Sequence, residues 1–385
     1  MGFSSPLPSR LDGPSTLVMA FGSSDLSEVG AGLHALECAF PTSVVVGCST
    51  SGHFRDGEIH GDGLVGVVCR FERTALSVAC APISGPHSSD LVGMDLGDRL
   101  RNATPVAPCS PHASGVGPLS GVLLFSDGLF ANGSAVLRGL REKIGPIDVF
   151  GGLAGDGTDF ASTWVMCPKG HGPHGVVAVG LYGDAVRLSY GSHGGWSPFG
   201  LERRVTAADG NVLYELDGRP ALELYKDYLG ELAAGLPATA LLFPLAVRAP
   251  GSDRPLVRTI LSTDNASGSM RFAGDIPEGG TAQLMRSTAD HLIDGAAIAA
   301  EMCLAADTRQ SDLGKGRLAF GVSCVGRRLV LGHRSDEELE AVSDVLGVSS
   351  TLVGFYSYGE ITPSYGASEL HNQTMTLTVI DEICA

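Results

Sequence analysis

The chain has 385 residues, of which 44% are hydrophobic and 18% charged, so it is long enough for two or three domains and is not an intrinsically disordered protein. Its 42 acidic and 26 basic residues give a net charge of −16, which argues against partners such as nucleic acid or an anionic membrane surface. The 53 glycines follow no three-residue period, which excludes collagen and predicts many tight turns.

Nine scattered cysteines form no C-x-x-C pair. This odd number favours buried free thiols in a reducing compartment, and we predict a cytoplasmic protein. The first ten residues lack the apolar core of a secretory signal, and no apolar run approaches 18 residues, so no membrane span is expected. No H-E-x-x-H or Walker A motif is present, and no metal site is predicted.

Apolar spacing in the first half predicts strands that alternate with helices. The expected elements are a helix over 25–39, strands over 44–49, 64–71, 75–82 and 121–129, a helix over 134–144, and strands over 147–152, 175–183 and 185–192. The strands over 64–71 and 75–82 are expected to pair, and those over 175–183 and 185–192 to form a hairpin.

The second half starts near Trp196 and continues the alternation. The expected elements are a helix opened by Pro220 and stopped by Gly230, a helix within 281–304, a strand over 316–324, a helix over 336–346 with a Ser335–Glu338 capping box, and strands within 352–361 and 374–380. The sequence therefore predicts an α/β fold in which mixed sheets are covered by helices, built as two related α/β units.

Three buried strands run into polar turns bracketed by glycine, in the segments 44–54, 147–157 and 351–361. Glycine at a strand end permits positive φ and close approach to a ligand, and the N–H groups of such turns can hold an anion. The same pattern is also typical of simple tight connections. If the turns form a site, they should lie within reach of one cavity.

The matches to catalytic motifs in this sequence are incomplete or lie in the wrong structural context. The GDGLVG segment at 61–66 precedes a strand instead of opening a helix, so it lacks the context of a dinucleotide-binding loop. The GCSTSG segment at 47–52 resembles a nucleophile elbow but has Ser51 where glycine is needed. An enzyme with a Cys48 or Ser49 nucleophile stays an alternative, and it requires a base nearby.

Several polar residues stand next to these strands. Asp127 follows a buried strand, Asp156 and Glu360 lie in two of the glycine turns, and His371 and Asn372 precede the last strand. Such groups suit a pocket for a small polar molecule, with the carboxylates facing an ammonium group. Local turn capping explains each of them equally well.

Taken together, the motifs resemble the FIST family (F-box and intracellular signal transduction proteins). The resemblance rests on GCSTSG (47–52), LLFSDGL (123–129), VFGGLAGDG (149–157), GGWSPFG (194–200), residues 203–225, FGVSCVGRR (320–328), GFYSYGEI (354–361) and LHNQT (370–374). It covers roughly 20–375 and implies an N-terminal FIST domain over 15–195 and a C-terminal FIST domain over 196–385. Residues 83–120 match no motif and are interpreted as a variable insertion.

The resemblance implies a small-molecule-binding sensory module of intracellular signal transduction, without enzymatic activity, for which amino-acid-like ligands are expected. No output domain is recognised, so a separate signalling protein such as a kinase is the expected partner. Some family members resemble haem-based nitric oxide sensors. Haem is therefore the alternative to a cofactor-free module, with His53, His193 and His371 as candidate axial ligands. By motif position, the predicted ligand-binding residues are Cys48, Ser49, Thr50, Asp127, Gly152, Asp156, Trp196, Glu215, Glu360, His371 and Asn372.

Overall fold

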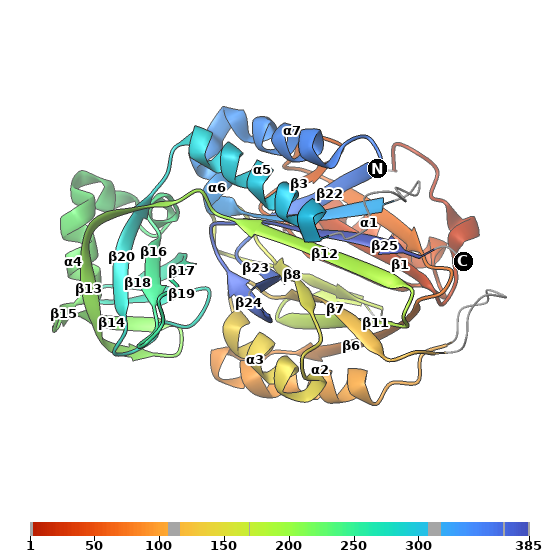
Figure 1. The fold of residues 1–385 in the computed structure, drawn as a ribbon, viewed down its shortest axis with the longest axis horizontal. Helices are drawn as coiled ribbons and strands as arrows, with labels where there is room; N and C mark the ends of the chain where they lie inside the picture. Colours follow the sequence, from red (N-terminus) through yellow and green to blue (C-terminus); the bar gives the residue numbers. More distant parts are fainter. Residues whose placement is uncertain (1–2, 107–115, 169, 307–316, 365, 384–385) are drawn as a thin grey trace.

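The structure is a computed structural model, and it describes residues 3–106, 116–168, 170–306, 317–364 and 366–383. Figure 1 shows a large body of three sheets and a smaller body beside it on the left. The predicted α/β class, with mixed sheets and covering helices, is confirmed.

A strand–helix–strand unit occurs three times in the large body. The parallel strand pairs are β1 (Thr16–Gly22) with β2 (Val44–Ser49), β7 (Leu119–Ser126) with β8 (Val149–Leu153), and β21 (Arg317–Cys324) with β22 (Ser350–Ser357). The helices between them are α1 (Leu26–Ala39), α3 (Gly133–Ile144), and α6 (Val325–Leu331) followed by α7 (Ser335–Leu346). The side chains of Asp25 and Asn132 cap the first two helices by accepting backbone N–H groups.

Each unit continues into a hairpin that joins the sheet of another unit. The hairpins are β3 (His53–Arg55) with β4 (Glu58–His60), β9 (Val165–Cys167) with β10 (Gly170–Gly172), and β23 (Glu360–Ser364) with β24 (Ala367–His371). They add to β22, β2 and β8, respectively, so that the three units exchange hairpins in a ring. The repeat seen in the sequence as three glycine turns is thus a repeat of the whole unit.

An antiparallel strand then returns along the first strand of each unit. These strands are β5 (Leu64–Arg70) on β1, β11 (Gly175–Tyr182) on β7, and β25 (Met375–Glu382) on β21. Two further strands complete the second and third sheets, β6 (Ala75–Pro82) on β11 and β12 (Val186–His193) on β25. The sheet orders are β10-β9-β2-β1-β5 (sheet A), β24-β23-β8-β7-β11-β6 (sheet C) and β12-β25-β21-β22-β3-β4 (sheet B).

Two pairings expected from the sequence are wrong. β5 does not pair with β6, and β11 does not form a hairpin with β12. In both places the short connection crosses from one sheet to the next, at residues 71–74 and 183–185. Closeness in sequence therefore marks a corner between sheets in this fold, not a hairpin.

Phenylalanines from all three sheets pack where the sheets meet. The Phe21 ring from sheet A lies 4.9 Å from that of Phe355 in sheet B and 5.6 Å from that of Phe125 in sheet C, between ring centroids. Phe320 and Phe150 extend this cluster, and all five side chains are buried. The three units thus share one core.

The smaller body is an insertion between β12 and the third unit. Its elements are β13 (Ser197–Asp209), β14 (Val212–Leu216), β15 (Arg219–Pro220), α4 (Ala221–Leu229), β16 (Leu245–Arg248), β17 (Leu256–Arg258), β18 (Ile260–Asp264), β19 (Ser269–Phe272) and β20 (Thr281–Arg286). Pro220 precedes α4, and Gly230 ends it at φ 57°, as predicted. The helix expected within 281–304 begins only at Ala289, because 281–286 forms a strand.

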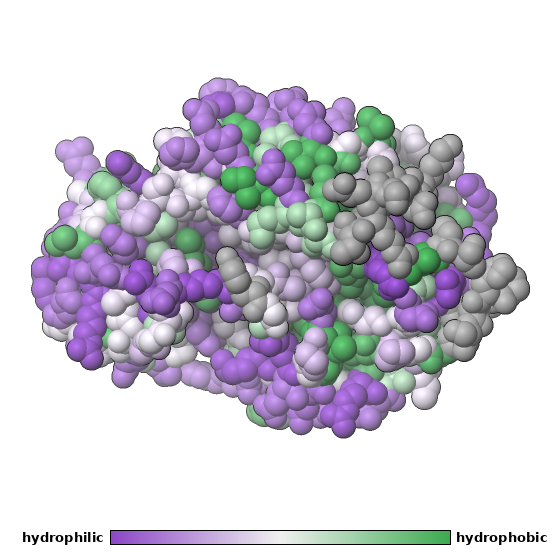
Figure 2. Space-filling view, in the orientation of Figure 1, coloured by the Kyte–Doolittle hydropathy of each residue, from purple (hydrophilic) through white to green (hydrophobic). Residues whose placement is uncertain are grey.

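Two helices cover the outer faces of the large body. α2 (Ser89–Arg101) lies in the segment that matches no motif and packs on α3, β6 and β11. α5 (Ala289–Ala306) packs on α7, β12 and β25. Figure 2 shows hydrophilic side chains over α2, α3 and much of the insertion. No helix in the described ranges is both long and apolar enough to cross a membrane. The 3-10 helices are Ser9–Leu11, Pro86–Ser88, Gly230–Gly235, Ala238–Leu242 and Gly332–Arg334.

The capping box predicted for α7 is wrong. Glu338 is fully buried, and its Oε1 accepts a hydrogen bond from Arg327 Nε at 2.7 Å. Ser335 Oγ donates instead to the carbonyl oxygen of Gly332 at 2.7 Å. The glutamate lies on the inner face of α7, where an ion pair outweighs a local cap.

Candidate functional site

The three glycine turns meet at one end of the large body. Three backbone hydrogen bonds join them in a ring, from Gly155 N to Ser49 O (3.0 Å), Ser51 N to Tyr356 O (2.8 Å) and Leu153 N to Gly359 O (2.8 Å). The prediction that the turns lie together is confirmed. Cys48, Ser49 and Thr50 are buried inside this junction.

Asp127 and Asp156 bind loops of the protein itself. Asp127 accepts hydrogen bonds from Leu129 N, Phe130 N, Thr163 Oγ1 and His174 N. Asp156 accepts them from Phe160 N, Ala161 N, Ser162 N and the Tyr358 hydroxyl. Because protein donors surround both carboxylates, their contacts match turn capping.

Glu360 and His371 are opposite each other across the β23–β24 pair. Glu360 is fully buried and accepts hydrogen bonds from Ser357 Oγ (2.9 Å) and from Thr374 Oγ1 (2.9 Å) and N (3.0 Å). Burial raises the pKa of Glu360 to about 8. Burial, with the nearby Arg258 and Arg254, lowers the pKa of His371 to about 3, so its imidazole is neutral.

The other predicted residues serve packing or lie elsewhere. Asn372 Nδ2 donates to Tyr358 O at 2.9 Å, and Trp196 Nε1 donates to Gln373 O at 2.8 Å. At Gly152, an added Cβ would lie 2.8 Å from Val322, so the glycine permits close packing there. Glu215 stands apart on β14 of the insertion, exposed to solvent.

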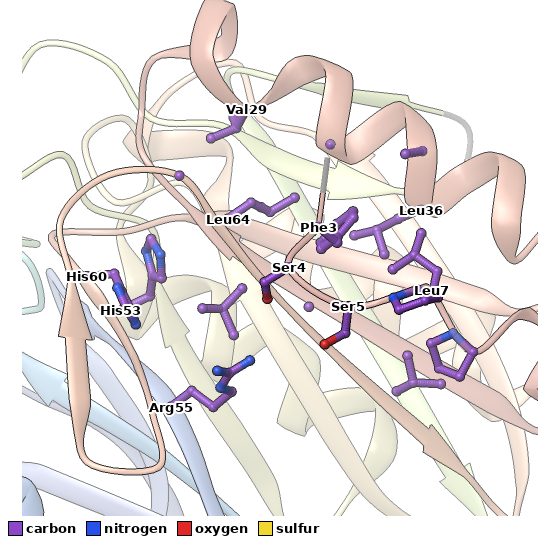
Figure 3. A pocket seen from close by; sticks show the side chains of 18 of the residues that line it. Phe3, Ser4, Ser5, Leu7, Val29, Leu36, His53, Arg55, His60 and Leu64 are labelled. Atoms are coloured by element: carbon purple, nitrogen blue, oxygen red, sulfur yellow. The ribbon is translucent and has the colours of Figure 1, made fainter. Parts of the chain in front are cut away.

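A groove of about 630 Å³ lies on the outer face of sheet A, between α1, β5 and the segment 3–8 (Figure 3). Its apolar part is lined by Phe3, Leu7, Val29, Leu36 and Leu64, and its polar end by His53, His60 and Arg55. Glu28 and Asp62 also line the groove. None of the eleven predicted ligand-binding residues lines it. A concave, mostly apolar space with a few convergent polar groups is typical of ligand pockets.

The polar end of the groove touches the first glycine turn. His53 Nδ1 lies 3.4 Å from Thr50 Oγ1, and the rings of His53 and His60 stack with centroids 6.0 Å apart. Burial, followed by His60 and Arg328, lowers the pKa of His53 to about 4. His53 is therefore neutral at pH 7 and can donate or accept a hydrogen bond.

The groove lies where the other two units carry a covering helix. In the second unit α2 packs on α3 and β11, and in the third α5 packs on α7 and β25. Among the described residues no such helix packs on α1 and β5, and the segment 3–11 and the β3–β4 hairpin border the space instead.

Glycines on the crossover helices support this comparison. Gly139 of α3 and Gly32 of α1 are each the seventh residue of their helix. A Cβ on Gly139 would lie 2.0 Å from the Asp90 carbonyl oxygen in α2, whereas one on Gly32 would meet only the side chains of Leu64 and Phe3. The same helix face therefore contacts a helix in one unit and lines a groove in the other.

A second cavity, of about 650 Å³, lies between the insertion and β24. Its charged groups are engaged with one another or with backbone. Arg254 NH2 lies 2.9 Å from Glu369 Oε2, and Arg258 Nε donates to Asp275 O at 3.2 Å. Charged groups of the groove also have partners, since Glu28 Oε1 accepts a hydrogen bond from Gly63 N at 2.6 Å and Arg55 Nε lies 3.6 Å from Asp56 Oδ2.

Sequence reasoning identified only His53 among the groove residues, and as a candidate haem ligand. The signal available was a short segment, 53–60, that carries two histidines and Arg55. The sequence alone does not show that this hairpin faces α1 and β5. The other groove residues were not predicted, because a space between elements has no sequence motif that would reveal it.

Comparison with known protein families decides the relationship. The family model of the FIST N domain matches residues 16–219, and that of the FIST C domain matches 221–363. The chain belongs to the FIST family. FIST domains are sensory domains of signal transduction. The FIST C segment includes α5, β21 and β22, so it contributes most of the third unit to the body that the FIST N segment begins.

The chain is also similar to several uncharacterized proteins. An uncharacterized protein of Mycobacterium tuberculosis is 27% identical over 267 residues, 67% of each chain. One of Mycobacterium bovis is 28% identical over 220 residues, 54% of each chain. One of Methanocaldococcus jannaschii is 27% identical over 198 residues, half of this chain and 36% of that protein.

Proposed function

We propose that this FIST protein binds a small molecule in the groove between α1 and β5 and passes the signal to a separate protein such as a kinase. The observation that carries the proposal is the open groove itself, at the position where α2 and α5 cover the other two units. Its volume of about 630 Å³ is within the usual range of ligand pockets.

The lining favours an amino-acid-like ligand with an apolar body. Val29, Leu36 and Leu64 offer an apolar wall to such a body. Arg55 suits a carboxylate, and Asp62 suits an ammonium group, through charge-assisted hydrogen bonds. The neutral imidazole of His53 adds a hydrogen-bonding group without adding charge.

The contacts at the glycine turns support binding without catalysis. Cys48 is fully buried, and burial raises its pKa well above the usual value, so its thiol stays protonated. Ser49 Oγ accepts a hydrogen bond from Trp164 N at 3.1 Å. Cys38, Cys48, Cys69, Cys303 and Cys324 are free thiols, which supports our proposal of a reducing compartment such as the cytoplasm.

The candidate axial histidines do not fit a haem pocket. His193 and His371 line neither cavity. His53 lines the groove, but at its charged end beside Arg55 and Asp62, whereas haem needs a large apolar cavity. The protein mixed with haemin is expected to show no haem-binding shift in its visible absorption spectrum.

The test is a thermal-shift screen with apolar amino acids and their acylated derivatives, because a ligand that binds only the folded state raises Tm. Gly32→Leu fills the groove and should abolish the Tm increase, since the Gly32 position faces Leu64 and Phe3. Gly30→Leu is the matched control, because a Cβ there meets no atom within 4 Å. A hit that survives Gly32→Leu unchanged would place binding elsewhere in the protein.

A further inference from the structure

Sheet A ends at β5, whereas the equivalent strands of the other sheets carry one more strand. β6 pairs antiparallel with β11, and β12 pairs antiparallel with β25. Within the described part of the chain, nothing pairs with the corresponding edge of β5. The repeat therefore defines a strand position beside β5 that no described residue fills.

The pairing of β6 with β11 in the second unit shows where this position begins. β6 starts at Ala75, opposite Tyr182 at the end of β11. By the same geometry, the missing strand would start beside Arg70 at the end of β5. The end of β25 reaches this corner, because the Glu382 carboxylate accepts hydrogen bonds from the backbone N–H groups of residues 72–74.

The edge of β5 has the chemistry of a strand that pairs with another strand. Its sequence, LVGVVCR, has one charged residue, Arg70, at its end. Its apolar side chains are only half-buried, while β11 is buried over nearly its whole length. An exposed apolar edge without a central charge is a template for strand addition.

The other sheet edges of the large body carry a charge, end in proline or are very short. β4 carries Glu58, β24 carries Glu369 and β12 carries Arg187. β6 ends in Pro82, and β10 has only three residues. Charges, proline and short length are the usual means by which proteins block pairing at sheet edges.

We propose that a second copy of this chain pairs with this edge, β5 against β5, so that the two A sheets form one continuous sheet across a two-fold axis. A two-fold axis makes the paired strands antiparallel, the orientation that β6 and β12 adopt on their own sheets. Each chain carries a net charge of −16, and β5 contains no acidic residue, so two copies approach along this strand with little local repulsion. The pairing requires no ligand and uses the free edge of β5, although the same strand also borders the groove of the proposed function.

Light scattering coupled to size exclusion tests the proposal on the full chain. The wild type is expected to reach about twice the mass of 39.7 kDa as concentration rises. Hydrogen exchange should show the amides of β5 gaining protection over the same concentrations. A wild type that stays monomeric at the highest attainable concentration overturns the proposal, as does a dimer in which β5 gains no protection.

Charge variants at Gly66 identify the interface. This residue is exposed on β5 and also lines the groove, and an added Cβ would lie 3.6 Å or more from Leu36 and Phe3, so there is room for a side chain. Gly66→Lys and Gly66→Glu should each raise the dissociation constant about tenfold or more, because like charges then face each other across the two-fold. Mixing the two variants should restore association.

Gly30→Lys on α1 is the matched control. It adds the same charge at a position where a Cβ meets no atom within 4 Å, away from the β5 edge, and should leave the dimer intact. If Gly66→Lys and Gly66→Glu associate as the wild type does, or if Gly30→Lys weakens association equally, the β5 interface is wrong.

Discussion

The first and second units have the same topology but different surroundings. In the second unit, β6 lies beside β11 and α2 packs on α3, so the strand and the helix are both covered. In the first, β5 has a free edge within the described chain and α1 borders a groove. The comparison teaches that one unit of a repeat can have an open groove and a free sheet edge where its described residues lack elements that its sister units contain.

The largest loss of stability is expected at the contact that holds the covering helix α5 on the third unit. Arg327 pairs with Glu338 of α7 and also donates to the Leu292 carbonyl oxygen of α5 at 2.7 Å, so it ties the covering helix to the third unit. Glu338→Gln leaves the buried guanidinium without its charge partner and should lower the free energy of unfolding by about 3–5 kcal/mol. Urea unfolding measures this loss.

The control is Glu337→Gln on the same helix. Glu337 pairs with Arg334 in solvent, so its loss should leave the free energy of unfolding nearly unchanged. Equal effects of the two substitutions would show that Arg327 and Glu338 do not fasten α5.

A smaller effect, on the pH dependence of stability, is expected when His53 at the polar end of the open groove is substituted. Its pKa of about 4 lies below the 6.5 of an unfolded chain, so the stability it contributes is complete above pH 6.5 and is lost as the pH falls toward 4. His53→Gln should reduce the loss of stability between pH 7 and pH 4.5 by about 2–3 kcal/mol. Denaturant unfolding of the wild type and the variant at the two pH values measures this change in the free energy of unfolding. An unchanged pH dependence would contradict a neutral, buried His53 imidazole.

The smallest expected change in stability comes from glycine substitutions that compare the crossover helices α3 and α1. Gly139→Ala places a methyl group against the Asp90 carbonyl oxygen and should cost about 1–3 kcal/mol of stability. Gly30→Ala on α1, with open space around its Cβ, should instead add about 0.5–1 kcal/mol through helix propensity. Thermal or urea unfolding of both variants checks the signs, and a loss of stability in both would remove the contrast.

Local signals in the sequence predicted local structure well. Pro220 and Gly230 delimit α4, and Gly347 ends α7 at φ 72°. These residues act through their own backbone preferences, so no distant contact is needed to read them. The three glycine turns were recognised as related for the same reason.

Long-range arrangement was harder to predict. Two short connections that resemble hairpin turns are corners between sheets, and nothing within residues 71–74 reveals the sheet that β6 enters. Glu338 matched a capping pattern, but its partner Arg327 lies in the preceding helix, so tertiary contact decided its role. Among the predicted site residues, Asp127 and Asp156 did come together with the turns, yet their carboxylates are taken up by backbone donors.

The exchange of hairpins has a consequence for how the chain folds as it is synthesised. β3 from the first unit pairs with β22, where His53 is opposite Phe355, and β23 pairs back with β8. The first sheet-to-sheet contacts at the N-terminus therefore cannot be completed on the ribosome until the last unit has emerged. A fragment cut at the boundary between the two FIST segments would expose Phe21 without Phe320 and Phe355. The two FIST segments are thus neighbours in sequence that share one core in the large body, and slow, late assembly is expected from such distant pairings.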